Sequence, residues 1–418
     1  MTSAAPPLAI RLSTPAPSPA RLDYLDGLRG LAALQVVFLH YTSAFLPVIA
    51  MAGTVPWYPA AMPGWQAAIA RSPLIFLING YSAVYIFFLM SGFVLRRAFA
   101  RINHGFEGVG RRVVRLGLPT SAAVGIAGIL LAVDDRAHRA AAAISGSTHW
   151  LGALMQAPPT FAAAIRDALL NSMLLGYRET TSFPPLAHLI SLSPLNTAFD
   201  VPVWTLNVEF AGSLICLALS LIGRRSRLAF ALVVIVLAFS AGASQLFLFV
   251  IGYLLAGSYP RPSCPVAKRL AVMALIGGVL LCRLTAFGPI LALRTLLRHQ
   301  HAPDGFHFTN QIGAILIFIA ILNLPMAQTI LSAKLPQWLG RISFSLYLLH
   351  FPIMATLGCS LFVATAPQIG IMAATLLAMA IGLPITLLAA TLFERWVDRG
   401  AVRLSHRVRW LQFAPAPG

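Results

Sequence analysis

Two residues that could perform chemistry, Arg29 and His40, lie eleven positions apart in the first apolar segment, LDGLRGLAALQVVFLH (25–40). In an α-helix, eleven residues make about three turns plus roughly 20° and rise about 16 Å, so both side chains face nearly the same way. Titratable groups cost about 3 kcal/mol in hydrocarbon, and they mark functional sites there. The pair therefore indicates a polar pathway that ends at a general base. A core histidine bonded to a carbonyl and an arginine that sets topology are the alternatives.

A candidate partner for the histidine is Glu209, in the stretch VPVWTLNVEF (201–210). A carboxylate beside an imidazole fixes its tautomer and stabilises the imidazolium, which predicts that Glu209 orients His40. Trp204 and Asn207 precede Glu209 and are predicted to line the same cavity as substrate-binding residues. The alternative for Glu209 is a carboxylate satisfied by a neighbouring arginine or by water.

Two further stretches carry residues suited to an anionic ligand. In GVGRRVVRLGLP (108–119), Arg112 and Arg115 are three positions apart and face the same way on a helix. Arginine forks match phosphate oxygens, and excess positive charge at the cytoplasmic face is the alternative explanation. In FFLMSGFVLRRAF (87–99), Ser91 and Gly92 remove bulk, so that another helix or a ligand can approach closely.

The composition predicts the elements that must position these residues. Hydrophobic residues make up 58% of the 418 residues and charged residues only 10%, and the mean hydropathy is +0.80. Such a chain is an all-α, polytopic transmembrane helical bundle. About ten spans are predicted, at roughly 28–50, 74–96, 113–133, 203–222, 228–241, 244–258, 270–286, 312–331, 342–362 and 369–393.

The arginines orient the predicted bundle. The formal charge of +18 is concentrated in short clusters between apolar runs, as in Arg224, Arg225 and Arg227. This pattern places both termini in the cytoplasm and excludes nucleic acid as the partner. Residues 1–22 are predicted to be a disordered cytoplasmic tail, 23–400 the transmembrane domain, and 401–418 a basic cytoplasmic tail. The long 134–202 segment then lies outside.

The motifs, taken in order, resemble those of acyltransferase family 3, the bacterial membrane O-acyltransferases that modify polysaccharides and lipid-linked glycans. The resemblance rests on LDGLRGLAALQVVFLH, FFLMSGF, RRVVR, VPVWTLNVEF, GRISFSLYLLHFPI (340–353) and FERW (393–396). It implies transfer of an acyl group, usually acetyl, from cytoplasmic acyl-CoA to a hydroxyl of a carbohydrate-type acceptor. It also implies an integral protein of the bacterial inner membrane, in contact with membrane lipids.

The resemblance also implies roles for individual residues. Arg29 and His40 match the family's essential pair, and Glu209 matches its acidic residue. Arg112 and Arg115, with Ser91 and Gly92, would bind the donor, and His350 would join the substrate-binding residues. Acyl-CoA is expected as a co-substrate, with no tightly bound cofactor. Direct attack by the acceptor and an acyl-histidine intermediate both remain open.

Other functions compete with acyl transfer. A transporter or flippase of a glycan or lipid-linked sugar would use the same polar stripe, but the repeated halves typical of transporters are missing from the sequence. A sensor or assembly protein with a dead site is a third class, and the intact set of candidate residues argues against it. A loop carries the residues His299, His301, Asp304 and His307. Such a cluster resembles a metal site, but we expect solvated histidines and no metal.

Overall fold

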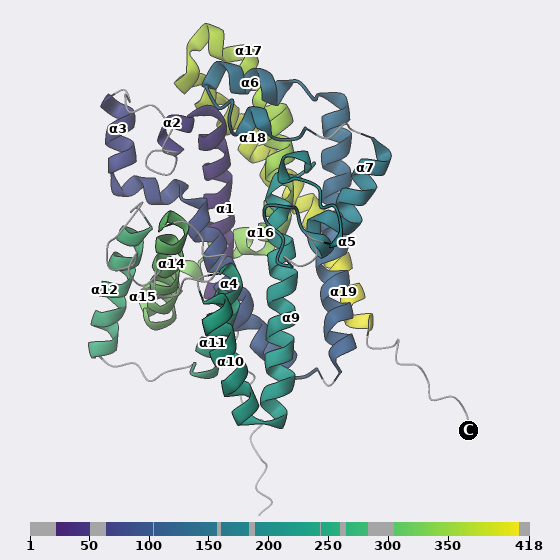
Figure 1. Cartoon of the computed structure of the whole chain (residues 1–418). Helices are drawn as coiled ribbons and strands as arrows, with labels where there is room; N and C mark the ends of the chain where they lie inside the picture. The colour runs from purple at the N-terminus through teal and green to yellow at the C-terminus, as the bar shows by residue number, and fades with distance from the viewer. Residues whose placement is uncertain are drawn as a thin grey trace, which may run out of the picture.

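The computed structural model describes residues 22–50, 64–102, 104–156, 160–183, 189–242, 244–259, 265–282 and 305–408. Within these ranges every element is helical (Figure 1), which confirms the all-α prediction. The long helices are α1 (Asp23–Phe45), α4 (Gly80–Phe99), α5 (Gly105–Val133), α9 (Trp204–Arg225), α10 (Arg227–Ala241), α11 (Gln245–Gly257), α12 (Pro265–Leu281), α14 (Gly305–Asn323), α16 (Lys334–Ile353) and α18 (Ile371–Phe393).

Shorter helices connect or extend these. The α-helical ones are α2 (Pro47–Ala50), α3 (Gly64–Arg71), α6 (Ala137–Ser145), α7 (Phe161–Arg166), α15 (Pro325–Leu331), α17 (Cys359–Ile369) and α19 (Arg399–Arg407). The 3₁₀ turns are η1 (Pro73–Ile78), η2 (Leu151–Ala153), η4 (Leu195–Thr197) and η5 (Val201–Val203). Three π-helical stretches are η3 (Asp167–Leu175), η6 (Met354–Gly358) and η7 (Glu394–Asp398).

The number of membrane spans stays a prediction. Among the described residues, five helices are long and apolar enough to cross a membrane, and a bent pair would make six. The five are 80–99, 105–133, 201–225, 334–369 and 371–407. Of the other predicted spans, α10 and α11 are short apolar helices of 15 and 13 residues. Helix α1 is continuous, but its apolar sequence is interrupted by polar residues, which include the candidate site residues Arg29 and His40.

The predicted span 312–331 is not straight, because the chain bends within it by 93°, as in a broken span or a re-entrant loop. Helix α14 ends at Asn323, Leu324 is extended, and α15 begins at Pro325. A proline has no N–H to donate, and it disfavours the helical conformation in the residue before it. The bend therefore has a local cause in the Leu324–Pro325 pair.

Both described ends of the chain reach the same end of the bundle, the lower end in Figure 1. We call it the basic end, because Arg96, Arg97, Arg224, Arg225, Arg403 and Arg407 lie there. The guanidinium of Arg224 donates to the carbonyl oxygens of Phe99 and Ile102, which ties the end of α9 to the end of α4. Helix α19 packs along α5 and buries Ala401 and Ser405, so helical structure continues past residue 400. Residues 1–21 and 409–418 lie outside the described ranges.

The opposite end is covered by the segment after α5, and hydrogen bonds fasten it to α1. The hydroxyls of Ser145 and Ser147 donate to the carbonyls of Ala44 and Ser43, at 2.7 and 2.8 Å. Helix ends leave carbonyls without partners, so these serines satisfy the end of α1. The same segment brings Trp150 over the bundle.

Buried acids lie further along this covering segment. The carboxylate of Asp167 accepts from the Tyr177 hydroxyl at 2.7 Å and from the Phe199 N–H at 3.1 Å. Burial nevertheless raises the pKa of Asp167, because desolvation outweighs these bonds. Burial and the nearby Asp167 raise the pKa of Asp200 well above its ordinary value. Neither Asp200 oxygen has a hydrogen-bond partner among the described residues.

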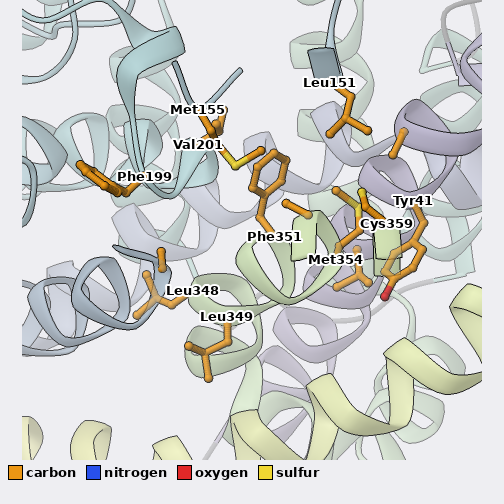
Figure 2. Close-up of a cluster of buried hydrophobic side chains, with 14 of the residues drawn as sticks. Tyr41, Leu151, Met155, Phe199, Val201, Leu348, Leu349, Phe351, Met354 and Cys359 are labelled. Atoms are coloured by element: carbon orange, nitrogen blue, oxygen red, sulfur yellow. The ribbon is translucent and has the colours of Figure 1, made fainter. Parts of the chain in front are cut away.

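The apolar interior has two main clusters. One joins α1 and α5 to α16, α17 and α18, and the other joins α4 and α9 to α11 and α14. Phe87 and Trp204 pack against both. Figure 2 shows the first cluster, where Phe351 of α16 lies between Met155 and Val201 on one side and Met354 on the other. The clusters meet along α1, α4, α9 and α16, and the candidate site lies there.

Candidate functional site

The two candidate histidines are hydrogen-bonded to each other. Nδ1 of His40 lies 2.7 Å from Nε2 of His350, and Nδ1 of His350 lies 3.1 Å from the carbonyl oxygen of Leu346. The two ring planes differ by only 22°, and their centroids are 4.9 Å apart. That separation equals the hydrogen bond plus one ring radius at each end, so the rings meet edge to edge.

These contacts fix the tautomers. A carbonyl oxygen can only accept, so the Leu346 carbonyl requires the proton of His350 on Nδ1. Nε2 of neutral His350 is then an acceptor, and His40 donates to it from Nδ1. The lone pair of neutral His40 is consequently on Nε2, the nitrogen outside this chain of bonds. A ring nitrogen with a free lone pair is what a general base needs.

Helices α1 and α16 bring the histidines together through glycine. A Cβ on Gly30 would overlap the backbone of Leu339 and Gly340, so the two helices touch at this point. Gly30 lies ten residues before His40, and Gly340 lies ten residues before His350. Because the helices run the same way, equal rises from this contact set the histidines level with each other.

Aromatic side chains surround His40 without closing it off. The indole of Trp150 lies nearly parallel to the imidazole, with centroids 5.8 Å apart and an interplanar angle of 15°. Phe351 meets the imidazole edge-on, at 5.3 Å and 84°. His40 is half-buried, whereas His350 and Phe351 are buried. Part of the His40 surface therefore stays accessible, although neither histidine is among the residues that line the cavity described next.

A cavity of about 310 Å³ lies between α1, α4, α5, α9 and α16. Its charged lining consists of Arg29, Arg112, Arg115 and Glu209, so Glu209 lies with the arginines and not with His40 as predicted. Its hydroxyl-bearing lining consists of Ser91, Thr205, Ser343 and Tyr347, and aromatic rings include Phe87 and Phe344. The cavity thus combines a net positive charge with an apolar wall.

Glu209 pairs with arginine rather than with histidine. Its Oε1 lies 2.7 Å from Nη2 of Arg112, and each side chain is only 15% exposed. The predicted bond between Glu209 and His40 is not formed, because the His40 Nδ1 is bonded to His350. A carboxylate beside a guanidinium in a dry interior is the stronger pairing, since it leaves neither charge unpaired.

The second arginine of the pair also has a carboxylate partner. Arg115 donates to Asp398 from the π-helical stretch η7, and its guanidinium lies 5.2 Å from the centre of the Phe344 ring. The Asp398 side chain is 8% exposed and that of Arg115 30%. Arg29 pairs with Asp26 at 3.3 Å, and about a third of each side chain is exposed. Asp398 could not be predicted from its sequence, because nothing in FERWVDRG indicates that a π-helical turn directs this side chain inward.

Ser91 and Gly92 have different roles in the structure. Ser91 lines the cavity. A Cβ on Gly92 would overlap the carbonyl of Phe249, so this glycine allows α4 to pack on α11. Close approach at Gly92 is therefore between helices, the first of the two predicted explanations.

Neither Trp204 nor Asn207 is among the residues that line the cavity. The Asn207 amide donates to the carbonyls of Met173 and Leu174 at 3.0 and 3.2 Å, and its oxygen accepts from the N–H of Ser182 at 2.7 Å. With these bonds Asn207 holds the covering segment against α9. Trp204 packs between the two apolar clusters.

Two hydroxyl groups at the site were missed in the sequence. The Tyr347 hydroxyl lies 2.7 Å from Oγ1 of Thr205 and 2.9 Å from the carbonyl oxygen of Pro202. Both side chains line the cavity, and the Tyr347 ring centroid is 5.9 Å from that of His350. Tyr347 could have been predicted from its position one helical turn before His350 in LYLLH, which places both side chains on one face of the helix.

The histidine-rich loop is described only at its last histidine. His299, His301 and Asp304 lie outside the described residues. His307 lies at the start of α14, where its Nδ1 is 2.8 Å from the hydroxyl of Tyr85.

Comparisons with known proteins agree with the motifs. The model of the acyltransferase domain family Acyl_transf_3 matches residues 22–395. The O-acetyltransferase PaAT-1 of Phomopsis amygdali is 27% identical over 92% of this chain and 83% of its own length. An acyltransferase of a Phoma species is 23% identical, with 93% of this chain and 96% of its own length covered. The acyltransferase clz18 of Cochliobolus lunatus is also 23% identical, over 90% of this chain and 93% of its own. No solved structure matches the chain.

Proposed function

Because the chain belongs to acyltransferase family 3, we propose that it moves an acyl group, acetyl in the first instance, from cytoplasmic acyl-CoA to a hydroxyl group of a carbohydrate-type acceptor. The observation that carries the proposal is the hydrogen-bonded pair of His40 and His350, one helical turn from a cavity that holds three arginines. A base and an anion-binding group are what an acyl-CoA-dependent O-acyltransferase requires.

The donor would enter from the basic end. Its phosphate groups would contact Arg29, Arg112 and Arg115, which line one cavity. Arg29 and His40 are separated by eleven residues of α1, a rise of about 16 Å. A phosphopantetheine arm is of similar length, so the thioester would reach the level of His40. In this arrangement Glu209 and Asp398 position the arginines, and phosphate replaces or joins the carboxylates.

The reaction then needs one proton transfer in each direction. Nε2 of His40 takes the proton from the acceptor hydroxyl, and the oxygen forms a bond to the thioester carbon. His350 accepts a hydrogen bond from Nδ1 of His40 and so stabilises the imidazolium that forms. As the bond between carbon and sulfur breaks, the imidazolium returns its proton to the CoA thiolate. Direct attack uses the free lone pair of His40 and needs no acyl-enzyme.

The membrane setting is supported by the five apolar helices and by the family. The three relatives are fungal proteins, so they give no support to the expected bacterial inner membrane. Their names include acetyl transfer to oxygen for one of them, and they do not name an acceptor. The carbohydrate-type acceptor therefore rests on the resemblance in motifs.

The decisive experiment measures free CoA released from acetyl-CoA by the purified protein in nanodiscs. Wild type would be compared with His40→Ala, and with His406→Ala as a control, since His406 is exposed on α19 and is not among the residues that line the cavity. Candidate glycans and lipid-linked sugars would be added in turn. We expect acceptor-stimulated release from wild type and the control, and a loss of about 10²–10⁴-fold in His40→Ala.

Two results would contradict the proposal. One is release of CoA by His40→Ala at the wild-type rate, which would show that His40 is not the general base. The other is a folded wild-type protein that binds no acetyl-CoA, which would favour transport of a glycan without acyl transfer.

A further inference from the structure

Acyl transfer from a thioester passes through a tetrahedral intermediate whose oxygen carries negative charge. A donor aimed at this oxygen usually makes the largest single contribution to the rate. The two histidines do not supply it, because their protons lie in the bonds to each other and to Leu346. Another group at the same end of the cavity has to donate.

Two of the four hydroxyl groups that line the cavity are poorly placed to donate to this oxygen. Ser91 lies eleven residues beyond Gly80, and Gly80 packs against Leu39, next to His40. Ser91 is therefore about 16 Å from the level of the histidines, near the arginines. The hydroxyl of Ser343 donates to the carbonyl of its own helix at Gly340. Among the described hydroxyls that line the cavity, Thr205 and Tyr347 remain.

Tyr347 lies at the right level. It precedes His350 by three residues of α16, which is a rise of about 4.5 Å toward the basic end. An acyl-CoA that enters from the arginines therefore passes Tyr347 just before its thioester reaches His40. The Tyr347 side chain is 7% exposed, so its hydroxyl acts in a largely dry environment where a hydrogen bond to a charged oxygen is strongest.

The hydrogen bonds of Tyr347 leave its proton exchangeable. Thr205 Oγ1 is 3.1 Å from the carbonyl of Pro202 and 2.7 Å from the Tyr347 hydroxyl. The Tyr347 proton is donated to the Pro202 carbonyl at 2.9 Å, and it is released when Thr205 donates to that carbonyl instead. It can then turn to a substrate oxygen without leaving the buried carbonyl unsatisfied, which avoids the cost of a lost bond.

We propose that Tyr347 is a catalytic residue that donates its hydroxyl proton in a hydrogen bond to the thioester carbonyl oxygen, and that Thr205 positions it. The assignment rests on the proposed acyl transfer. The bond strengthens as the acceptor oxygen adds to the carbonyl carbon and negative charge collects on the carbonyl oxygen. It weakens again when the carbon–sulfur bond breaks and the carbonyl re-forms. The Tyr347 proton stays on its oxygen throughout.

The test compares Tyr347→Phe with Tyr253→Phe in the CoA-release assay. Tyr253 is a matched control, because its hydroxyl also bonds a buried hydroxyl, that of Ser220 at 3.0 Å, in a contact between α9 and α11 away from the cavity. We expect Tyr347→Phe to lower kcat by about 100-fold, with KM for acetyl-CoA and the melting temperature close to those of Tyr253→Phe. Thr205→Ser should keep kcat, and Thr205→Val should lower it.

The outcomes distinguish failure of the role of Tyr347 from failure of the proposed acyl transfer. An active wild type together with a Tyr347→Phe variant of unchanged kcat overturns the role of Tyr347 alone. A loss in Tyr347→Phe that tracks a higher KM or a lower melting temperature also overturns it, because a structural role then suffices. A wild type that transfers no acyl group overturns the proposed function, and this inference with it.

Discussion

The imidazole of His40 is oriented by a second imidazole and a carbonyl, where a carboxylate was expected. Leu346, His350 and His40 form a chain of hydrogen bonds that ends at the free Nε2. Glu209 lies on another helix and neutralises Arg112. The two assignments make different demands on the kinetics, because a partner of the base acts on kcat and a partner of the donor site acts on binding.

Single substitutions of His350 and Glu209 should separate a role in catalysis from a role in donor binding. His350→Ala removes the acceptor that holds the His40 proton on Nδ1, so we expect kcat to fall by about 10²–10⁴-fold with little change in KM for acetyl-CoA. Glu209→Gln removes the charge that holds Arg112 in place. We therefore expect the KM for acetyl-CoA to change, while the pH dependence of kcat stays that of wild type. Steady-state kinetics across a pH series would measure both.

A Glu209→Gln enzyme with a shifted pH dependence of kcat would contradict this assignment. It would place the carboxylate in contact with His40 during turnover, as the sequence first indicated. Wild-type kinetics for His350→Ala would show that His40 needs no partner to hold its tautomer.

At the scale of elements, α1 and α16 position the site through the contact of Gly30 with Gly340. Gly30→Ala places a methyl group against the backbone of α16. We expect a loss of about 1–3 kcal/mol in stability from overpacking, and a lower kcat because the histidines move apart. Thermal unfolding in nanodiscs and the CoA-release assay would measure the two effects.

Gly125 provides the control for this change. It lies inside α5, and a Cβ there would meet no atom within 4 Å. Gly125→Ala should therefore leave stability unchanged or raise it by up to about 1 kcal/mol, since alanine is the better helix former. Equal melting temperatures for the two variants would show that the tight glycine contact does not hold the helices in register.

Helical periodicity explains what the sequence could predict about the site. It placed Arg29 and His40 on one face of α1, and it grouped Arg112 with Arg115, because both relations lie within one helix. Which carboxylate meets which arginine depends on how helices pack, and the sequence holds no such rule. His350 was assigned to the site through its motif, but its bond to His40 depends on the register of two helices that are far apart in the chain.

The same limit applies to the fold. Long apolar runs predicted α5, α16 and α18, and the structure places all three helices there, although α5 and α16 begin earlier than predicted, at Gly105 and Lys334. Local proline chemistry could have located the bend at Leu324–Pro325. The division of the interior into two apolar clusters, with the cavity where they meet, comes from long-range packing that periodicity does not encode.

At the scale of the whole molecule, the charge distribution gives the bundle a direction. The basic end carries clustered arginines, and the cavity arginines lie on the helices that lead there. An anionic donor is attracted to such a surface before it binds. The proposed reaction requires this end to face the cytoplasm, where acyl-CoA is found, and the rule that cytoplasmic loops are rich in arginine favours the same orientation.

Labelling of single cysteines would test this orientation. Ala100 is exposed at the end of α4 on the basic end, and Thr148 is exposed in the covering segment at the opposite end. Cys216, Cys282 and Cys359 are buried and should react slowly, and replacement of Cys264 by serine removes the remaining native thiol. A membrane-impermeant maleimide should label Thr148→Cys in intact cells, and Ala100→Cys only after permeabilisation. The reverse pattern would place the arginine-lined cavity on the side without acyl-CoA, and the donor would then have to be a different anion.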